Sequence, residues 1–244
     1  MMKKEDIPVV ILCGGRGTRL KEETVVKPKP LVEIGNYPIL WHIMKIYSFY
    51  GFNNFILCLG YKGEMIKEYF CDNKNKDEKW RIALADTGET ALKGARLKRI
   101  EKYVKSDTFM VTYGDGLANI NISNLLKFHL KHKRIGTLSG VRPPSRFGRI
   151  KVEGDKVLEF SEKPQLEESL INGGFFVFSR RLFDYLSDEN SCDFEIGVLD
   201  KLAKEGELMV YKHFGDWLCM DNIRDAEYLN KLWNSEKAFW KVWK

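Results

Sequence analysis

The stretch Ile11-Leu12-Cys13-Gly14-Gly15-Arg16-Gly17-Thr18-Arg19-Leu20 decides how this chain folds. The apolar run from Val9 to Leu12 predicts a buried strand. The run ends in three glycines within four residues, and glycine lets the backbone turn sharply and approach a ligand closely. Backbone N–H groups in such a turn suit a polyphosphate, with the Thr18 hydroxyl and the Arg19 cation beside them. The alternative is a tight strand-to-helix turn without a ligand.

The spacing of the loop excludes two common phosphate-binding motifs. A Walker A loop carries Lys-Ser or Lys-Thr after its second glycine, whereas Gly17 is followed by Thr18. A dinucleotide-binding fingerprint needs another glycine three residues after Gly17, where this chain has Leu20. The segment Lys27-Pro28-Lys29-Pro30 follows closely, and its prolines fix the path of the two lysines. These cations favour a phosphate ligand over a plain turn.

Length and composition predict one globular α/β domain. The chain has 244 residues, of which 44% are hydrophobic and 30% charged. Its net charge of +6 is spread along the chain, so phosphorylated small molecules explain it as well as nucleic acid does. No segment approaches the ~20 apolar residues of a membrane span, and the N-terminus predicts a strand rather than a signal peptide. We expect neither a nucleic-acid nor a membrane partner.

Cysteine and histidine usage argues against a zinc site. The five cysteines are odd in number and contain no CxxC pair, which also argues against a disulfide framework. They favour a reducing compartment, so we expect a cytoplasmic protein. Cys13 and Cys58 lie in apolar runs and are predicted core residues. No histidine spacing is typical of metal binding, and we interpret His42 and His129, on predicted helices, as structural.

Strands and helices alternate through the first half. Apolar runs predict strands at 9–12, 55–59, 81–85 and 108–113, and helical periodicity predicts helices at 39–50, 63–70, 97–104 and 122–130. This alternation predicts a Rossmann-like, doubly wound, mostly parallel sheet flanked by helices. Residues 147–160 predict an antiparallel hairpin, and 175–178 a further strand. We expect a single domain over 1–244, with a nucleotide-binding half at about 1–135 and an acceptor half, ending in an aromatic helix, at about 136–244.

Three segments resemble the signature of the sugar-1-phosphate nucleotidyltransferases: Gly14 to Leu20, Lys29-Pro30-Leu31-Val32-Glu33-Ile34 and Pro38-Ile39-Leu40. The resemblance runs from about Val9 to the C-terminus. Within the family, Glu22 to Pro30, Leu40 to Lys45, Gly60 to Gly63 and the Trp-rich tail are most similar to the branch that uses CTP and glucose 1-phosphate.

The resemblance implies attack of the sugar phosphate on the α-phosphorus of CTP, giving CDP-glucose and pyrophosphate for nucleotide-sugar and cell-surface polysaccharide synthesis. The attacking phosphate is already ionised at neutral pH, so no general base is required. Catalysis should therefore depend on positioning and on charge neutralisation by Mg²⁺ and cationic side chains.

The resemblance also implies roles for individual residues. Arg19 and Lys29 become the catalytic cations, and Asp115 and Asp221 become Mg²⁺ ligands. The nucleotide-binding residues are Leu12, Gly14, Gly15, Gly17, Thr18, Arg19, Lys29, Gly88 and Arg96. The residues that bind the sugar phosphate are Asp115, Gly148, Glu162, Lys163, Asn172 and Gly173.

Residue types alone leave other interpretations open at several positions. Asp115 also suits a turn, and Asp221 the N-cap of a helix that starts near Ile223. The tripeptide Glu162-Lys163-Pro164 suits a surface turn, and Arg96 a solvated helix face. Glycines 148, 173 and 174 suit β-bulges.

Two departures from the branch bear on specificity and assembly. The connection between Phe70 and Asp86 is short, and Gly94-Ala95 replaces a Gly-Gly pair. The C-terminal aromatics Trp233, Phe239, Trp240 and Trp243 pack either on their own subunit or at a subunit interface, and we expect a homo-oligomer. Besides the CTP reaction, two functions stay open. One is the same chemistry with UTP, dTTP or another phosphorylated acceptor, and the other is an inert homologue that binds a nucleotide sugar.

Overall fold

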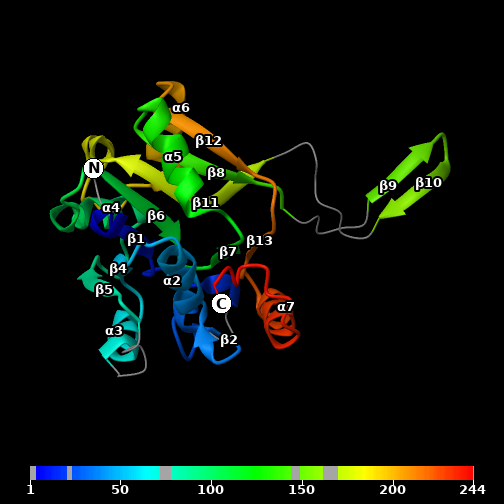
Figure 1. The fold of residues 1–244 in the computed structure, drawn as a ribbon, viewed down its shortest axis with the longest axis horizontal. Helices are drawn as coiled ribbons and strands as arrows, with labels where there is room; N and C mark the ends of the chain where they lie inside the picture. The colour runs from blue at the N-terminus through cyan, green and yellow to red at the C-terminus, as the bar shows by residue number, and fades with distance from the viewer. Residues whose placement is uncertain (1–3, 21–23, 72–77, 144–148, 162–169, 244) are drawn as a thin grey trace.

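Strand β1 (Val9–Leu12) lies within a seven-stranded sheet of order β12-β8-β11-β6-β1-β4-β5 (Figure 1). The structure is a computed structural model that describes residues 4–20, 24–71, 78–143, 149–161 and 170–243. The strands β4 (Asn54–Leu59), β5 (Arg81–Asp86) and β6 (Thr108–Tyr113) confirm the other strands predicted in the first half. Because buried parallel strands are apolar on both faces, they were recognisable as continuous apolar runs.

The sheet is mixed, as Figure 1 shows. β1 pairs in parallel with β4 and β6, and β4 pairs in parallel with β5. β11 (Ile171–Ser179) runs antiparallel to β6 and to β8 (Gly136–Val141), and β12 (Leu208–His213) is parallel to β8. β11 is therefore the one strand of this sheet that runs against the others. Strands from both predicted halves share the sheet, and the division of labour between the halves stays a prediction.

The sequence analysis missed β8 and β12. Gly136 and Gly140 interrupt the apolar pattern of β8, and both lie where the sheet packs closely. A Cβ atom on Gly136 would lie 2.8 Å from Leu208 Cδ1, and one on Gly140 would lie 2.7 Å from Val210 Cγ2. β12 is an edge strand with exposed side chains, including Met209 and Val210, so it lacks the apolar run of a central strand.

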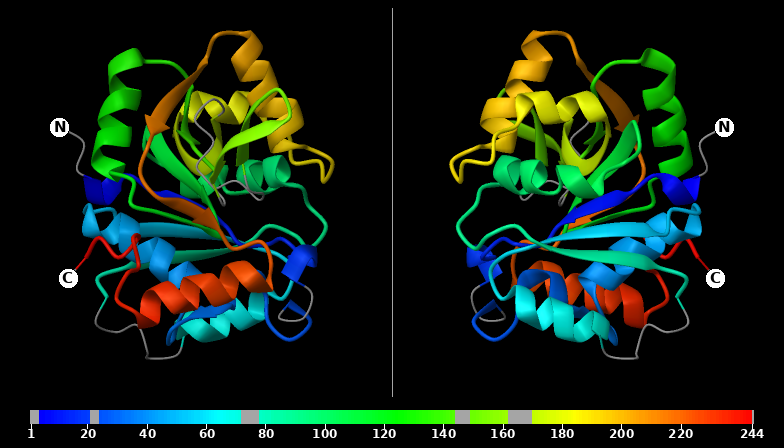
Figure 2. Two further views of the ribbon diagram at one scale, coloured as in Figure 1. Left: turned by 90° about the vertical axis from the view of Figure 1, so that its right-hand side faces the viewer. Right: turned by 90° about the vertical axis from the view of Figure 1, so that its left-hand side faces the viewer.

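Helices cover both faces of the sheet (Figure 2). One face packs on α2 (Ile39–Phe49), α3 (Gly63–Cys71), α5 (Ile122–His132) and α7 (Ile223–Asn234). The other packs on α4 (Lys93–Arg99), the 3-10 segment η6 (Arg180–Tyr185), the π-helical segment η7 (Phe194–Leu199) and α6 (Asp200–Lys204).

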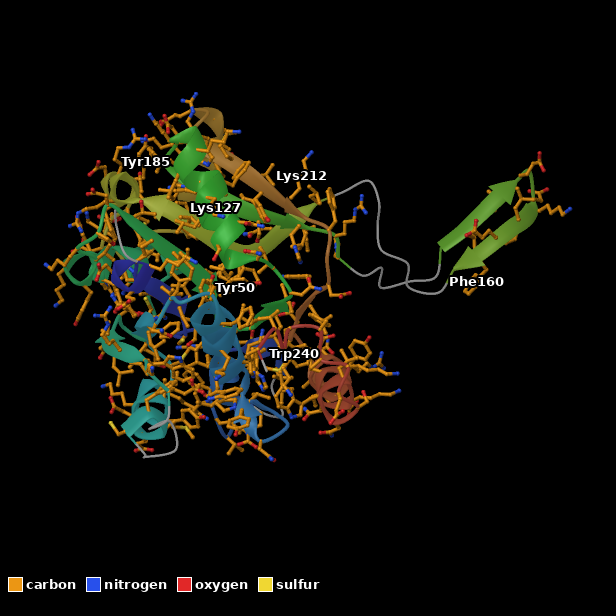
Figure 3. The ribbon with its side chains drawn as sticks, viewed as in Figure 1. Tyr50, Lys127, Phe160, Tyr185, Lys212 and Trp240 are labelled. Atoms are coloured by element: carbon orange, nitrogen blue, oxygen red, sulfur yellow. The ribbon has the colours of Figure 1, made fainter. Side chains whose placement is uncertain are left out.

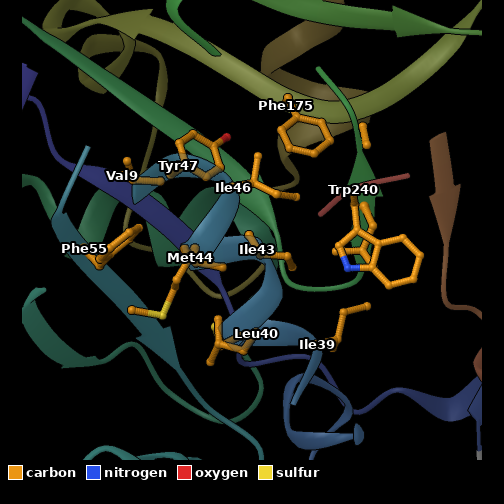
Figure 4. Packing of buried hydrophobic residues seen from close by; sticks show 14 of the residues in the cluster. Val9, Ile39, Leu40, Ile43, Met44, Ile46, Tyr47, Phe55, Phe175 and Trp240 are labelled. Carbon is orange, nitrogen blue, oxygen red and sulfur yellow. The ribbon is translucent and has the colours of Figure 1, made fainter. Parts of the chain in front are cut away.

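Strand alternation explains the two cores. Val9 and Ile11 belong to the first core and Val10 to the second, because successive side chains of a strand point to opposite faces. In Figure 4, α2 side chains such as Ile43 and Tyr47 lie among Val9, Phe55 and Phe175 of the sheet. The helical periodicity of 39–50 therefore corresponds to real packing.

The predicted helix at 97–104 is wrong in its second half. α4 ends at Arg99, and a 3-10 turn, η5, follows at Glu101–Tyr103. Leu97, Ile100 and Val104 are nevertheless all fully buried in the second core. Because a helix followed by a 3-10 turn buries the same spacing of residues, periodicity could not separate the two.

The predicted hairpin is confirmed as β9 (Arg149–Glu153) paired antiparallel with β10 (Lys156–Ser161). Its turn contains Gly154, whose φ is +55°. Figure 1 shows the hairpin apart from the main sheet, and Figure 3 labels Phe160 on it. The Phe160 side chain is 65% exposed. Two further strand pairs are small: β2 (Glu33–Ile34) with β3 (Tyr37–Pro38), and β7 (Gly116–Ala118) with β13 (Trp217–Cys219).

The C-terminal aromatics pack on their own chain. Trp240 is fully buried and lies near Ile39 in Figure 4. It stacks on Trp233 and donates its indole N–H to His42 Nδ1 at 3.2 Å. His42 Nε2 in turn lies 2.9 Å from the Ile34 carbonyl, and His129 Nδ1 lies 2.9 Å from Thr137 Oγ1. Both histidines are therefore structural, as predicted.

Cys13 and Cys58 are buried core residues as predicted, and burial raises the pKa of Cys58 to about 12. In the ranges that the structure covers, no helix has the length and apolar character needed to cross a membrane.

Candidate active site

A cavity of about 640 Å³ lies where the loops that follow β1 and β6 meet. The carboxyl ends of parallel strands share one edge of a sheet, and such edges are where ligands bind in open α/β folds. Because β11 is antiparallel, it brings its first residues to this edge. The cavity is lined by predicted site residues from distant parts of the chain: Leu12, Gly14, Gly15, Gly17, Thr18, Lys29, Arg96, Asp115, Asn172 and Asp221.

The glycine loop needs its glycines for close packing. Gly17 has a φ of +61°, and a Cβ there would lie 2.8 Å from Thr24 Cγ2. The Thr24 hydroxyl, itself buried, donates to the Leu20 carbonyl at 2.9 Å, which holds the far end of the loop. Gly15, in contrast, faces open space, with no atom within 4 Å of a built Cβ. Packing therefore holds the loop on the side away from the cavity, while no side chain that the structure describes covers the backbone at Gly15 on the cavity side. This geometry allows a phosphate to approach the backbone closely.

Arg96 stabilises this loop through a hydrogen bond to the Gly14 carbonyl. Its guanidinium donates from Nη2 to the Gly14 carbonyl at 2.9 Å, and from Nη1 to the Leu59 carbonyl at 3.0 Å and the Gly88 carbonyl at 2.7 Å. It also donates to Thr87 Oγ1 and to the Glu89 carbonyl, and the residue is only 4% exposed. The solvated helix-face interpretation is therefore wrong. Arg96 connects the loops after β1 and β5 with the last residue of β4, and its predicted contact with nucleotide stays a prediction.

Gly88 lies outside the cavity lining, at the turn after β5. Its φ is +86°, and a Cβ there would lie 2.6 Å from Arg99 Nη1. Arg99 donates from that nitrogen to the Thr87 carbonyl at 2.6 Å. The two arginines explain why the turn needs a glycine, without reference to a ligand.

Lys29 begins the 3-10 turn η3 (Lys29–Leu31) between Pro28 and Pro30. Its ammonium lies 2.7 Å from Asp115 Oδ2 and 3.1 Å from Asp221 Oδ1. Burial acts to lower the pKa of Lys29, but attraction to Asp115 and its hydrogen bond outweigh burial, so the pKa rises above its usual value. The neighbouring Lys27 instead lies 3.8 Å from Glu33 Oε1.

Hydrogen bonds to their main-chain groups hold Asp115 and Asp221 in place. Asp115 follows β6, and its carbonyl accepts from the Met220 N–H at 2.9 Å. Asp221 follows β13, and its own N–H donates to Asp225 Oδ2 at 2.9 Å. The N-cap of α7 is Asn222, which forms a capping box with Asp225, so the N-cap interpretation of Asp221 is wrong.

The two carboxylates fit a divalent cation. They already share one cation, the Lys29 ammonium, whose charge stands in for that of a metal ion. Carboxylate oxygens are the ligands that Mg²⁺ prefers, and the adjoining cavity leaves space for phosphate oxygens. Cys219 adds a third potential donor, since ligand atoms of Asp115, Cys219 and Asp221 all lie within 4.8 Å of one another.

A hydrogen-bond chain supports the acceptor side of the cavity. Asn172 Nδ2 donates to the Tyr113 hydroxyl at 3.0 Å, and that hydroxyl donates to Glu195 Oε1 at 2.7 Å. Burial and the Glu195 charge raise the pKa of Tyr113 above its usual value. The Gly173 carbonyl accepts from Trp217 Nε1 at 2.8 Å, so Gly173 supports the wall without lining it.

Sequence reasoning missed several cavity residues, among them Tyr113, Trp217 and Cys219. A signal existed for the last two, because they precede Asp221 at intervals of two residues, and a strand places such residues on one face. Tyr113 is the last residue of a predicted strand, immediately before Gly114-Asp115. The Arg19 side chain, Gly148, Glu162 and Lys163 lie outside the described residues, and their roles stay predictions.

Comparison with known proteins gives consistent matches. A family model described as nucleotidyl transferase matches residues 8–241. The chain is 46% identical to the glucose-1-phosphate cytidylyltransferase of Salmonella typhi, across 96% of this chain and 98% of that protein. It is 45% identical to the probable glucose-1-phosphate cytidylyltransferase of Bacillus subtilis, across 96% of this chain and 99% of that protein. The crystal structure of HddC from Yersinia pseudotuberculosis has the same fold, with a TM-score of 0.73, 24% identity and coverage of 93% and 99%.

Proposed function

The chain belongs to the nucleotidyl transferase family, and on this premise we propose that it transfers a cytidylyl group from CTP to glucose 1-phosphate, giving CDP-glucose and pyrophosphate. The observation that carries the proposal is the nearly full-length similarity to the Salmonella and Bacillus relatives, both named for this reaction. The cavity supports it, because a glycine loop, a partly buried lysine and two carboxylates line one space.

The chain's own residues supply positioning and charge. The backbone of the glycine loop faces the triphosphate, and Lys29 offsets the negative charge that grows on the reacting phosphates. Arg96 keeps Gly14 in place through the hydrogen bond to its carbonyl. The sugar phosphate approaches from the side of Asn172, and its oxygen attacks the α-phosphorus as pyrophosphate leaves. We further propose that Arg19 acts on the leaving phosphates, and that Gly148, Glu162 and Lys163 bind the acceptor.

Asp115 and Asp221 are the residues that would hold Mg²⁺. When bound, such an ion polarises phosphoryl oxygens and neutralises charge on the triphosphate. In the metal-free protein, Lys29 keeps the two carboxylates together and offsets their mutual repulsion. The site is therefore preorganised for a cation before substrates arrive.

Pyrophosphate release tests the proposal. CTP, UTP, dTTP, ATP and GTP are each incubated with Mg²⁺ and one of several sugar 1-phosphates. We expect strong release with CTP and glucose 1-phosphate. Release with another pair would support nucleotidyl transfer but would assign a different nucleotide or acceptor. No release from folded protein would favour an inert homologue that binds a nucleotide sugar. The homo-oligomer, the cytoplasmic location and the polysaccharide role stay predictions.

A further inference from the structure

We propose that Cys219 makes the carboxylate pair a three-donor site that binds a thiophilic divalent cation, such as Cd²⁺ or Zn²⁺, more tightly than it binds Mg²⁺. This inference rests on the proposed function only in placing a metal at Asp115 and Asp221. It assigns Cys219 as the residue that determines which metal the free protein prefers.

The fold aims Cys219 and Asp221 at the same space. Cys219 ends β13 and pairs with Gly116 of β7, the residue after Asp115. Met220 lies between Cys219 and Asp221 in the chain and is fully buried in the first core. Because alternate residues of an extended chain point to opposite sides, Met220 in the core leaves its two neighbours facing the cavity, which both of them line.

The donors converge on a position that already holds positive charge. Ligand atoms of Asp115, Cys219 and Asp221 lie within 4.8 Å of one another, and the Lys29 ammonium lies 2.7 and 3.1 Å from the two carboxylates. Within the described ranges, no other group of three such side chains converges in this way. A metal would replace that ammonium and add the sulfur as a ligand.

Donor chemistry sets the order of affinity. Mg²⁺ takes oxygen ligands and gains little from a thiol, whereas Zn²⁺ and similar cations bind thiolate strongly. Binding is a ligand exchange: a metal–sulfur bond forms, the thiol proton passes to solvent, and Lys29 leaves the carboxylates. The open side of the cavity provides room for water or phosphate oxygen to complete the coordination.

Titration of the folded, full-length protein with Cd²⁺, without nucleotide, tests the proposal. The readouts are the ultraviolet sulfur-to-metal charge-transfer absorption and the dissociation constant from calorimetry. We expect Cys219→Ser to remove the band and to weaken Cd²⁺ binding by at least about 10- to 100-fold. Mg²⁺ affinity should be unchanged. Cys71→Ser, at an exposed position on α3, is the matched control and should keep both the band and the affinity.

Two further outcomes sharpen the test. Asp115→Asn should also weaken Cd²⁺ binding, because the carboxylate belongs to the same site. A band that persists in Cys219→Ser, or a wild-type protein without a band, would overturn the proposal. Cys219→Ala is a second variant in case Cys219→Ser misfolds, and thermal unfolding checks that each variant is folded. Since the titration contains no CTP, its failure leaves the transfer reaction standing, and a failed transfer reaction leaves the titration interpretable.

Discussion

Lys29 Nζ lies 2.7 Å from Asp115 Oδ2, although 86 positions separate the two residues in the chain. The ammonium occupies space that a divalent cation would need, since it also touches Asp221. A metal and Lys29 therefore compete for the same oxygens in the free protein. Nucleotide phosphates offer Lys29 a new partner, so metal and nucleotide should bind more tightly together than apart.

Lys29→Met tests both roles of this lysine. We expect pyrophosphate release to fall by about 10²- to 10³-fold, because a positioned charge is lost from the transition state. We also expect Mn²⁺ to bind the variant more tightly than wild type when nucleotide is absent, because its competitor is gone. Electron paramagnetic resonance of free Mn²⁺ measures the second effect.

The matched control is Lys27→Met, which removes the neighbouring lysine that faces Glu33. It should leave turnover and Mn²⁺ affinity close to the wild-type values. Equal losses in the two variants, or unchanged Mn²⁺ binding in Lys29→Met, would contradict competition at the carboxylates.

Asp115→Asn should abolish turnover while the fold stays intact. The amide keeps the shape of the side chain but removes the charge that a divalent cation requires. Steady-state kinetics over a range of Mg²⁺ concentrations should show no recovery, and circular dichroism should match wild type. Asp155→Asn, in the exposed hairpin turn, is the control. An active Asp115→Asn protein would count against Asp115 as a metal ligand.

Arg96→Met should destabilise the segments that Arg96 connects, which carry Gly14, Leu59 and Gly88. The variant removes the guanidinium hydrogen bonds to the Gly14, Leu59 and Gly88 carbonyls, so we expect a loss of about 3 to 5 kcal/mol in the free energy of unfolding. Urea denaturation measures this loss. Arg224→Met, at an exposed position on α7, should change it by less than about 0.5 kcal/mol.

The conservative variant Arg96→Lys separates the brace from charge alone. The lysine side chain cannot donate to several loops at once, because its ammonium lacks the planar fork of arginine. Arg96→Lys should therefore recover only part of the stability that Arg96→Met loses. Full recovery would show that the hydrogen-bond geometry described above contributes little.

The carboxylate pair with Lys29 and the hydrogen bonds of Arg96 show what the sequence could and could not predict. Strands such as β1 were predictable because they are buried on both faces, whereas the roles of the site residues near their carboxyl ends were predicted from the family resemblance. The brace by Arg96 was not, because its partners are mainly backbone carbonyls, which leave no pattern in residue types. The placement of Lys29 between two carboxylates depends equally on tertiary structure, which spacing along the chain does not encode.

The edges of the sheet were also unpredictable. β12 has exposed side chains, and the glycines of β8 resemble those of a loop until their neighbours are known. The Trp-rich tail was ambiguous for a similar reason, since an aromatic side chain signals burial without naming the surface that buries it. Here the surface is α2 of the same chain, through the contact between Trp240 and His42.

That contact predicts a pH-dependent stability. His42 is neutral when folded: Nδ1 accepts from the Trp240 indole, so Nε2 carries the proton donated to the Ile34 carbonyl. Burial lowers the pKa of His42 from 6.5 to about 4, so protonation favours the unfolded chain. The stabilisation is complete above pH 6.5 and is lost as pH falls toward about 4. The loss in the free energy of unfolding should reach about 3 kcal/mol. Its slope with pH should correspond to the uptake of at most one proton on unfolding.

Urea denaturation from pH 7 downward measures this loss against His42→Gln, which cannot titrate. The variant should be less stable at neutral pH but should lose less on acidification, and the difference in slope isolates His42 from His129, whose pKa burial also lowers to about 4. Trp240→Phe removes the indole donor while keeping an aromatic ring in the core. It should lower stability and keep the pH slope, because burial rather than the indole hydrogen bond is the main cause of the shift. Parallel curves for wild type and His42→Gln would show that His42 does not titrate differently on folding, and the acid sensitivity would then have to come from other groups.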